Sequence, residues 1–176
     1  VSEQTGKSGL SIFDNAATGG FHVRSRGYDR DQVEMVWGLE PSAGMRKLAR
    51  RNPGGADLVL EMIDLPGEEI PLGTDSIDTV LLTYTLCTIP DALVALRAMQ
   101  RVLRPGGRLL FCEHGLAPDP DVARWQNRIN PAWRAVAGGC NLNRDIPALL
   151  GSAGFRILDE ERMYVPGVRA LNYNYW

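Results

Sequence analysis

The stretch IDTVLLTYTLCTIPDALVALRAMQRVLRPGGRLLFCEH, residues 77–114, decides the fold of this chain. Its first ten residues, 77–86, are rich enough in apolar and β-branched side chains to predict a buried strand. Asp91 then caps a helix whose apolar residues recur at helical spacing, and Pro-Gly-Gly at 105–107 ends it. Residues 108–113 are a second buried strand. This succession of strand, helix and strand predicts a parallel pair joined by a right-handed crossover.

The same alternation continues on both sides of this stretch. We expect strands at 33–39, 58–63, 155–159 and 171–176, and helices at 42–51, 122–136 and 146–153. Ser42 has the side chain of an N-cap, and Pro131 should kink or divide its helix. The fold class is therefore α/β, with a doubly wound and mostly parallel sheet.

Composition narrows the functional classes. The 176 residues suit one domain, and 44% hydrophobic with 23% charged residues is ordinary for a globular protein. A net charge of −2 provides no basic field, so we expect no nucleic-acid partner. No apolar run approaches the ~20 residues of a membrane helix, and the first residues do not resemble a signal peptide. Three cysteines without paired spacing favour a reducing, cytoplasmic location.

Glu40 lies where a doubly wound sheet binds its ligands, directly after the strand at 33–39. A carboxylate at this point can accept both hydroxyls of a ribose. A solvated glutamate near a helix N-terminus explains the position equally well. Both interpretations stay open.

Two glycine-containing segments are candidate cofactor turns. Gly6-Lys7-Ser8-Gly9 resembles part of a phosphate loop, but no strand fits before it, so a turn that a cofactor approaches is the better interpretation. Ala17-Thr18-Gly19-Gly20 precedes Glu40 by about 20 residues, the spacing of dinucleotide folds. A surface turn is the alternative for each.

Cys112 and His114 stand two apart on a predicted strand and so share a face. Zinc needs about four ligands, and no Cys or His stands at a suitable spacing to complete a set, so we expect no metal site. His114 is better interpreted as a polar group at the ligand edge, able to act as a base near neutral pH. The alternative is a histidine that caps a loop.

Three segments resemble class I S-adenosylmethionine-dependent methyltransferases: Gly38-Leu39-Glu40-Pro41-Ser42, Ile77-Asp78-Thr79-Val80 and the LxPGGRLL turn at 103–110. A longer stretch of the chain resembles a small bacterial branch that is similar to ubiquinone-biosynthesis and methyltransferase-like enzymes, which act on alkyl thiols and small molecules. Residues 65–72, 83–90, 113–115, 138–140, 143–144 and 174–176 carry this similarity.

The resemblance implies a Rossmann-like sheet with an antiparallel C-terminal strand, and S-adenosyl-L-methionine as cofactor. It divides the chain into an irregular segment at 1–27 and an α/β domain at 28–176. The implied cofactor-binding residues are Gly6, Ser8, Gly9, Glu40, Pro41, Ser42, Met45, Asp64, Leu65 and Thr83. The implied catalytic residues are His114 and Tyr84, at the methyl-transfer edge.

The first family motif, a strand that ends in an acid and a GxGxG turn, is degenerate here. Residues 1–10 fit it only in part, and Thr5 and Lys7 occupy places of glycines. We therefore expect the first strand to be missing or distorted. The predicted function is methyl transfer to a small-molecule thiol, hydroxyl or activated carbon. The alternatives are a non-catalytic remnant that serves as a binding module and, on the acid at Glu40 alone, a nicotinamide-dependent oxidoreductase.

Overall fold

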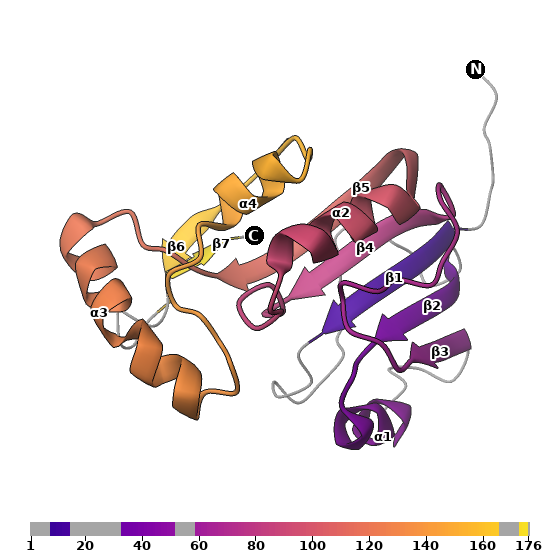
Figure 1. Cartoon of the computed structure of the whole chain (residues 1–176). Helices are drawn as coiled ribbons and strands as arrows, with labels where there is room; N and C mark the ends of the chain where they lie inside the picture. The colour runs from indigo at the N-terminus through magenta and orange to yellow at the C-terminus, as the bar shows by residue number, and fades with distance from the viewer. Residues whose placement is uncertain (1–7, 15–32, 52–58, 166–172, 176) are drawn as a thin grey trace.

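A computed structural model describes residues 8–14, 33–51, 59–165 and 173–175 (Figure 1). The strands are β1 (Ser8–Asp14), β2 (Val33–Leu39), β3 (Val59–Ile63), β4 (Ile77–Thr83), β5 (Leu103–His114), β6 (Arg162–Tyr164) and β7 (Tyr173–Tyr175). The helices are α1 (Ala43–Arg51), α2 (Ala92–Val102), α3 (Pro120–Val136) and α4 (Ile146–Ser152). None of the helices in this described part has the length and apolar character that a membrane crossing requires.

The strands form one sheet in the order β3-β2-β1-β4-β5-β7-β6. The first five strands pair in parallel, whereas β7 is antiparallel to both β5 and β6. The predicted α/β class, with a mostly parallel sheet and an antiparallel C-terminal strand, is confirmed. The strand order reverses between β1 and β4, and ligands of such sheets bind beyond the carboxyl ends of the strands at this point.

The first strand is present, so the expectation that it is missing is wrong, whereas its ladder with β2 is distorted by a shift in register between Ser8 and Gly9. Residues 8–14, SGLSIFD, form β1 at the centre of the sheet, in parallel register with β2 and β4. The prediction of an irregular segment over 1–27 is wrong for these same residues. The glycines at 6 and 9 suggested a turn. Backbone hydrogen bonds to β2 on one side and β4 on the other stabilise a strand here, although serine and glycine have weak β propensity. Residues 1–7 and 15–27 lie outside the described part.

The C-terminal third departs from prediction at two elements. Residues 155–159 form no strand, because Phe155 donates its backbone N–H to the Leu150 carbonyl and so completes the end of α4. Helix α3 continues through Pro131. Its buried Gln126 and Asn130 bind backbone groups outside the helix, and these contacts offset the one hydrogen bond that proline removes.

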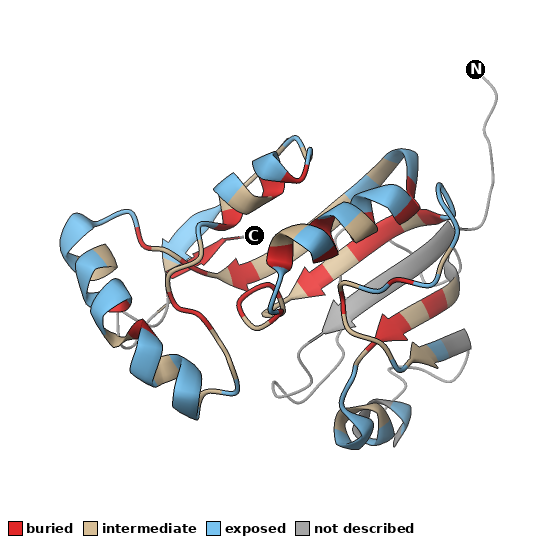
Figure 2. Cartoon of the chain, viewed as in Figure 1, coloured by how far each residue is buried: buried red, intermediate tan, exposed pale blue. Residues whose placement is uncertain are grey.

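In Figure 1, helix α2 lies in front of β4 and β5 and covers that face of the sheet. Asp91 caps it, accepting a hydrogen bond from the N–H of Val94 at 3.0 Å. Its buried side of Ala92, Ala95, Leu96, Met99 and Val102 belongs to one apolar core with β4 and α4, visible as red segments in Figure 2. This packing holds the carboxyl ends of β4 and β5, and the loops that follow them, in fixed positions.

Candidate functional site

Glu40 follows β2 directly and is held by its neighbours. Its Oε1 accepts the N–H of Ser42 at 2.7 Å, and its own N–H donates to the Ile63 carbonyl at 3.2 Å. Ser42 caps α1 as predicted, with the Met45 N–H 3.4 Å from its hydroxyl. Pro41 is exposed beside it. The predicted ribose-binding carboxylate is therefore half-exposed at the carboxyl edge of the sheet, fixed at the start of a helix.

Asp64 occupies the equivalent place after β3, one strand further out. Both of its carboxylate oxygens accept hydrogen bonds from the guanidinium of Arg46, which also donates to the Glu40 carbonyl at 2.7 Å. Arg46 thus joins the ends of β2 and β3. Leu65, predicted to flank the adenine, is half-buried in the chain after Asp64.

Tyr84 follows Thr83, the last residue of β4, in a strained backbone conformation. Its φ of 49° is uncommon for a residue with a side chain, and such residues cluster at functional sites. Its N–H donates to the Cys112 carbonyl at 2.9 Å, and its ring stacks on His114 with 6.1 Å between centroids. Burial raises the pKa of Tyr84 to about 12, so its hydroxyl is a neutral donor at physiological pH.

Glu113 is a fully buried carboxyl that sequence reasoning missed. Its Oε1 accepts the backbone N–H groups of Thr85 at 2.7 Å and Leu86 at 3.1 Å. Burial raises the pKa of Glu113 to about 7. Its signal in the sequence is an acid within an otherwise apolar strand. Glu113 fixes the loop after β4, and Arg144 holds the same loop by donating to the carbonyls of Leu86 and Pro90.

Three ligand-type side chains meet beside Tyr84. The Nε2 of His114 lies 3.2 Å from the Sγ of Cys140, and these two atoms and the Sγ of Cys87 all lie within 4.8 Å of one another. A hydrogen bond between the thiols lowers the pKa of Cys140 and, together with burial, raises the pKa of Cys87. The sequence placed Cys112 and His114 on one face and showed no further ligand at a suitable spacing, whereas the fold brings Cys87 and Cys140 to His114 from segments far along the chain.

The predicted glycine turn near the N-terminus requires a correction. Ser8 and Gly9 begin β1, and Ser8 is in register with Val33 at the start of β2. They therefore lie at the amino edge of the sheet, opposite Glu40 and His114. Gly6 and the second candidate turn at 17–20 lie outside the described residues, although the latter follows the carboxyl end of β1 in sequence.

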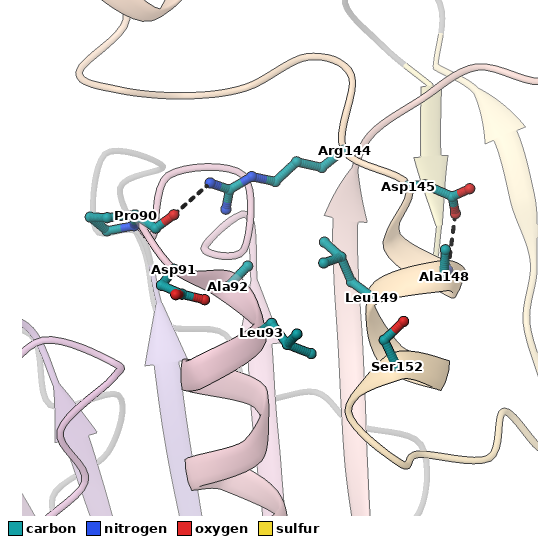
Figure 3. A pocket seen from close by; sticks show the side chains of 9 residues that line it. All are labelled: Pro90, Asp91, Ala92, Leu93, Arg144, Asp145, Ala148, Leu149 and Ser152. Carbon is teal, nitrogen blue, oxygen red and sulfur yellow. Dashed lines mark hydrogen bonds between the residues drawn. The ribbon is translucent and has the colours of Figure 1, made fainter.

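A cleft of about 390 Å³ lies between the start of α2 and α4 (Figure 3). Arg144 crosses its upper end, donating to the Pro90 carbonyl at 3.2 Å, while Asp145 caps α4 through the Ala148 N–H at 3.0 Å. Leu93 and Leu149 face each other across the cleft. It adjoins the loop after β4 from the side of the helices.

A family model described as a methyltransferase domain matches residues 17–111, more than half of the chain. Human thiol S-methyltransferase TMT1B is 37% identical over 103 residues, which cover 57% of this chain and 42% of that protein. Demethylmenaquinone methyltransferase of Listeria welshimeri is 34% identical over 102 residues, with the same two shares. The chain thus matches less than half the length of these curated relatives.

Solved structures support the fold. A putative methyltransferase of Bacillus halodurans superposes with a TM-score of 0.68 over 90% of this chain and 67% of that one. At 18% sequence identity, this likeness concerns the architecture alone.

Proposed function

Because the chain belongs to the methyltransferase-domain family, a class I family whose methyl donor is S-adenosylmethionine, we propose that it transfers that methyl group to a small-molecule thiol. The predicted resemblance to class I methyltransferases is confirmed by this membership. A thiol is preferred over a hydroxyl or an activated carbon because the thiol S-methyltransferase relative is the more similar of the two compared above. The cofactor side of the proposal rests on one observation: at the carboxyl end of β2, a hydrogen bond from the Ser42 N–H holds the Glu40 carboxylate in place.

The described residues fit the cofactor at this edge. A half-exposed carboxylate after β2 suits the two ribose hydroxyls, and its Oε1 is already oriented by the Ser42 N–H. Ser42 and Met45 would lie beside the ribose and adenine, Asp64 and Leu65 beside the adenine, and Thr83 towards the methyl group. The cofactor supplies a sulfonium-activated methyl group, and alignment of the acceptor with such a group is worth about 7–11 kcal/mol of the barrier.

On the acceptor side, Tyr84 and His114 form a stacked pair at the ends of β4 and β5. We assign Tyr84 the role of a neutral hydrogen-bond donor that orients the acceptor, since a phenol whose pKa is raised to about 12 is protonated at neutral pH. His114 is proposed to contact the acceptor sulfur, and its role as a base stays a prediction. Replacement by alanine should lower turnover about 100-fold or more if His114 moves the acceptor's proton.

Two further features of the proposal concern location and partners. Cys87, Cys112 and Cys140 are free thiols, in keeping with a reducing, cytoplasmic compartment. The net charge of −2 favours a small molecule over nucleic acid as partner.

Calorimetry with S-adenosylmethionine tests the cofactor side. Glu40→Ala should weaken binding about tenfold or more, equivalent to about 1.4 kcal/mol, because the carboxylate contacts are lost. Glu61→Ala is the matched control, since Glu61 is an exposed acid within β3 and should leave binding unchanged. Absence of heat at millimolar cofactor would favour a binding module without catalysis.

Turnover is tested with the intact chain, S-adenosylmethionine and a pair of matched acceptors, 2-mercaptoethanol and ethylene glycol. Mass spectrometry should detect the methyl thioether from the thiol and no ether from the diol. Methylation of the diol alone would contradict the proposed acceptor class.

A further inference from the structure

Cys87, His114 and Cys140 come from three separate segments that converge at the acceptor side. Cys87 lies in the loop after β4, His114 ends β5, and Cys140 lies in the turn after α3. Their ligand atoms all lie within 4.8 Å of one another, and the Cys140 Sγ to His114 Nε2 distance is 3.2 Å. Cys112, two residues before His114, does not belong to this group.

This spacing is that of a metal-binding set. Zinc binds thiolate sulfur at about 2.3 Å and imidazole nitrogen at about 2.0–2.1 Å in tetrahedral geometry, so neighbouring ligand atoms stand roughly 3.5–3.8 Å apart. The observed separations, 3.2 Å between the Cys140 Sγ and the His114 Nε2 and at most 4.8 Å within the group, lie around these values. Two thiolates and one imidazole are the soft ligands that select zinc among common divalent metals.

The surroundings hold the three ligands together without a metal. Both the backbone N–H and the side-chain amide of Asn141 donate to the Cys87 carbonyl, at 2.8 and 2.9 Å. Gly138 and Gly139, with φ of 62° and 91°, turn the chain so that Cys140 reaches the group. The ligands are therefore arranged by the fold, and binding would not have to order the loops first.

Access to the group is one-sided. Cys87 is buried, with 2% of its surface exposed, whereas His114 and Cys140 are half-exposed. Among the residues that the structure describes, three side chains offer ligand atoms here, one fewer than a closed tetrahedral site has. A three-ligand set that solvent reaches is typical of zinc sites with an open position for water or substrate.

We propose that Cys87, His114 and Cys140 bind one zinc ion and that the sulfur of the acceptor thiol takes its open position. This inference rests on the proposed thiol methylation. It gives His114 the role of a ligand, and the metal then takes the place of a separate base.

Methyl transfer from the sulfonium to the acceptor conserves atoms, charge and electrons. A thiol that coordinates zinc loses its proton to solvent and becomes a thiolate. The thiolate sulfur forms a bond to the methyl carbon as the bond from that carbon to the sulfonium sulfur breaks. The electron pair of the broken bond goes to the former sulfonium sulfur, which gives the neutral thioether S-adenosylhomocysteine, and the methylated acceptor, now also a neutral thioether, leaves the zinc.

Metal binding is tested with zinc alone on the intact chain, kept reduced by a phosphine so that no added thiol competes. One zinc per chain should remain after gel filtration, measured by atomic emission. Cys140→Ser and Cys87→Ser should each weaken zinc binding about 100-fold or more, whereas Cys112→Ser, the matched thiol control, should leave it unchanged. Cys140→His, which keeps a ligand, should retain zinc, and circular dichroism checks that each variant is folded.

Cobalt substitution tests the open position. Cobalt(II) in the site should show thiolate charge-transfer absorption, and 2-mercaptoethanol should shift this spectrum while ethylene glycol should not.

Equal zinc retention by the Cys112 and Cys140 serine variants, or a Cys87–Cys140 disulfide in place of a metal site under the same reductant, would overturn the inference. Cofactor binding that persists without any zinc binding refutes the metal site alone. Zinc binding without cofactor binding refutes the methyltransferase proposal.

Discussion

The side chain of Glu113 is enclosed between β5 and the loop after β4, where it accepts two backbone N–H groups. Leu86 is buried and Thr85 is partly buried, so Glu113 is the acceptor that satisfies their N–H groups away from bulk water or at its margin. The position of Tyr84, Cys87 and the rest of this loop depends on that one carboxyl. Glu113 is therefore a positioning residue, which acts through the loop after β4.

Removal of the Glu113 carboxyl should be costly, whereas an isosteric amide should be tolerated. Glu113→Ala leaves two backbone donors without an acceptor, at roughly 1–3 kcal/mol of unfolding free energy for each. Glu113→Gln keeps an oxygen at the Oε1 place and should cost less than about 1.5 kcal/mol. Urea denaturation of the two variants measures the difference, and equal losses would contradict the role.

At this scale, the sequence predicted the residues whose signal is local. Glu40 after a strand and Ser42 before a helix are recognisable from their immediate neighbours. The Cys87, His114 and Cys140 group was not predictable from spacing, because its members lie on different segments that only the sheet and α3 bring together. An acid within an apolar strand was the one signal of Glu113, and its role was missed because its partners, the backbone N–H groups of Thr85 and Leu86, cannot be identified from the sequence.

At the scale of the element, the short strand β7 is held between β5 and β6 by its tyrosines. Tyr175 is 4% exposed, donates its hydroxyl to the Leu116 carbonyl, and pairs in register with Glu113 of β5. Burial raises the pKa of Tyr175 to about 12 from 10.0. The folded protein thus keeps this proton to a higher pH than the unfolded chain does.

This difference predicts an alkaline loss of stability that Tyr175→Phe should reduce. Between about pH 10 and pH 12 the folded state binds the proton and the unfolded state has lost it, so stability falls as the pH rises. Tyr175→Phe should lower the unfolding free energy by about 1 kcal/mol at pH 8 through loss of the hydrogen bond, and should flatten the alkaline decline. Denaturation series at pH 8 and pH 11 measure both effects. A decline of unchanged slope would contradict the assignment.

Elements with strong periodicity were predictable, and elements set by their neighbours were not. The apolar spacing of α2 and the apolar runs of β2 and β4 specify their own structure. In contrast, β1 contains serine and glycine and is a strand because β2 and β4 pair with it on both sides. Residues 155–159 look apolar enough for a strand, yet Phe155 and Ile157 pack on the core from a loop.

For the whole molecule, the reversal of strand order between β1 and β4 separates two halves. Glu40 and Asp64 lie on the β2 and β3 side, and Tyr84, His114 and Cys140 lie on the β4 and β5 side. A cofactor that binds at the reversal would contact elements of both halves and so stabilise the entire folded state.

Ligand binding should therefore raise the melting temperature as a single transition. At a cofactor concentration of 100 times Kd, mass action adds about 2.7 kcal/mol of stability. For a chain of this length that corresponds to roughly 5–11 °C. Differential scanning fluorimetry with S-adenosylmethionine measures the shift, and Glu40→Ala should reduce it at the same concentration. A shift that is identical in the variant would show that binding does not involve Glu40.

The central position of β1 also has a consequence for how the chain reaches this structure. β1 ends at Asp14, whereas β4, which pairs with it in the middle of the sheet, begins only at Ile77. The middle of the sheet therefore joins segments that are remote along the backbone. Such long loops must close before their contacts yield any free energy, which slows folding. During synthesis on the ribosome, β1 therefore cannot pair with β4 until residues 77–83 have emerged, and chaperones would bind its unpaired edge in this interval.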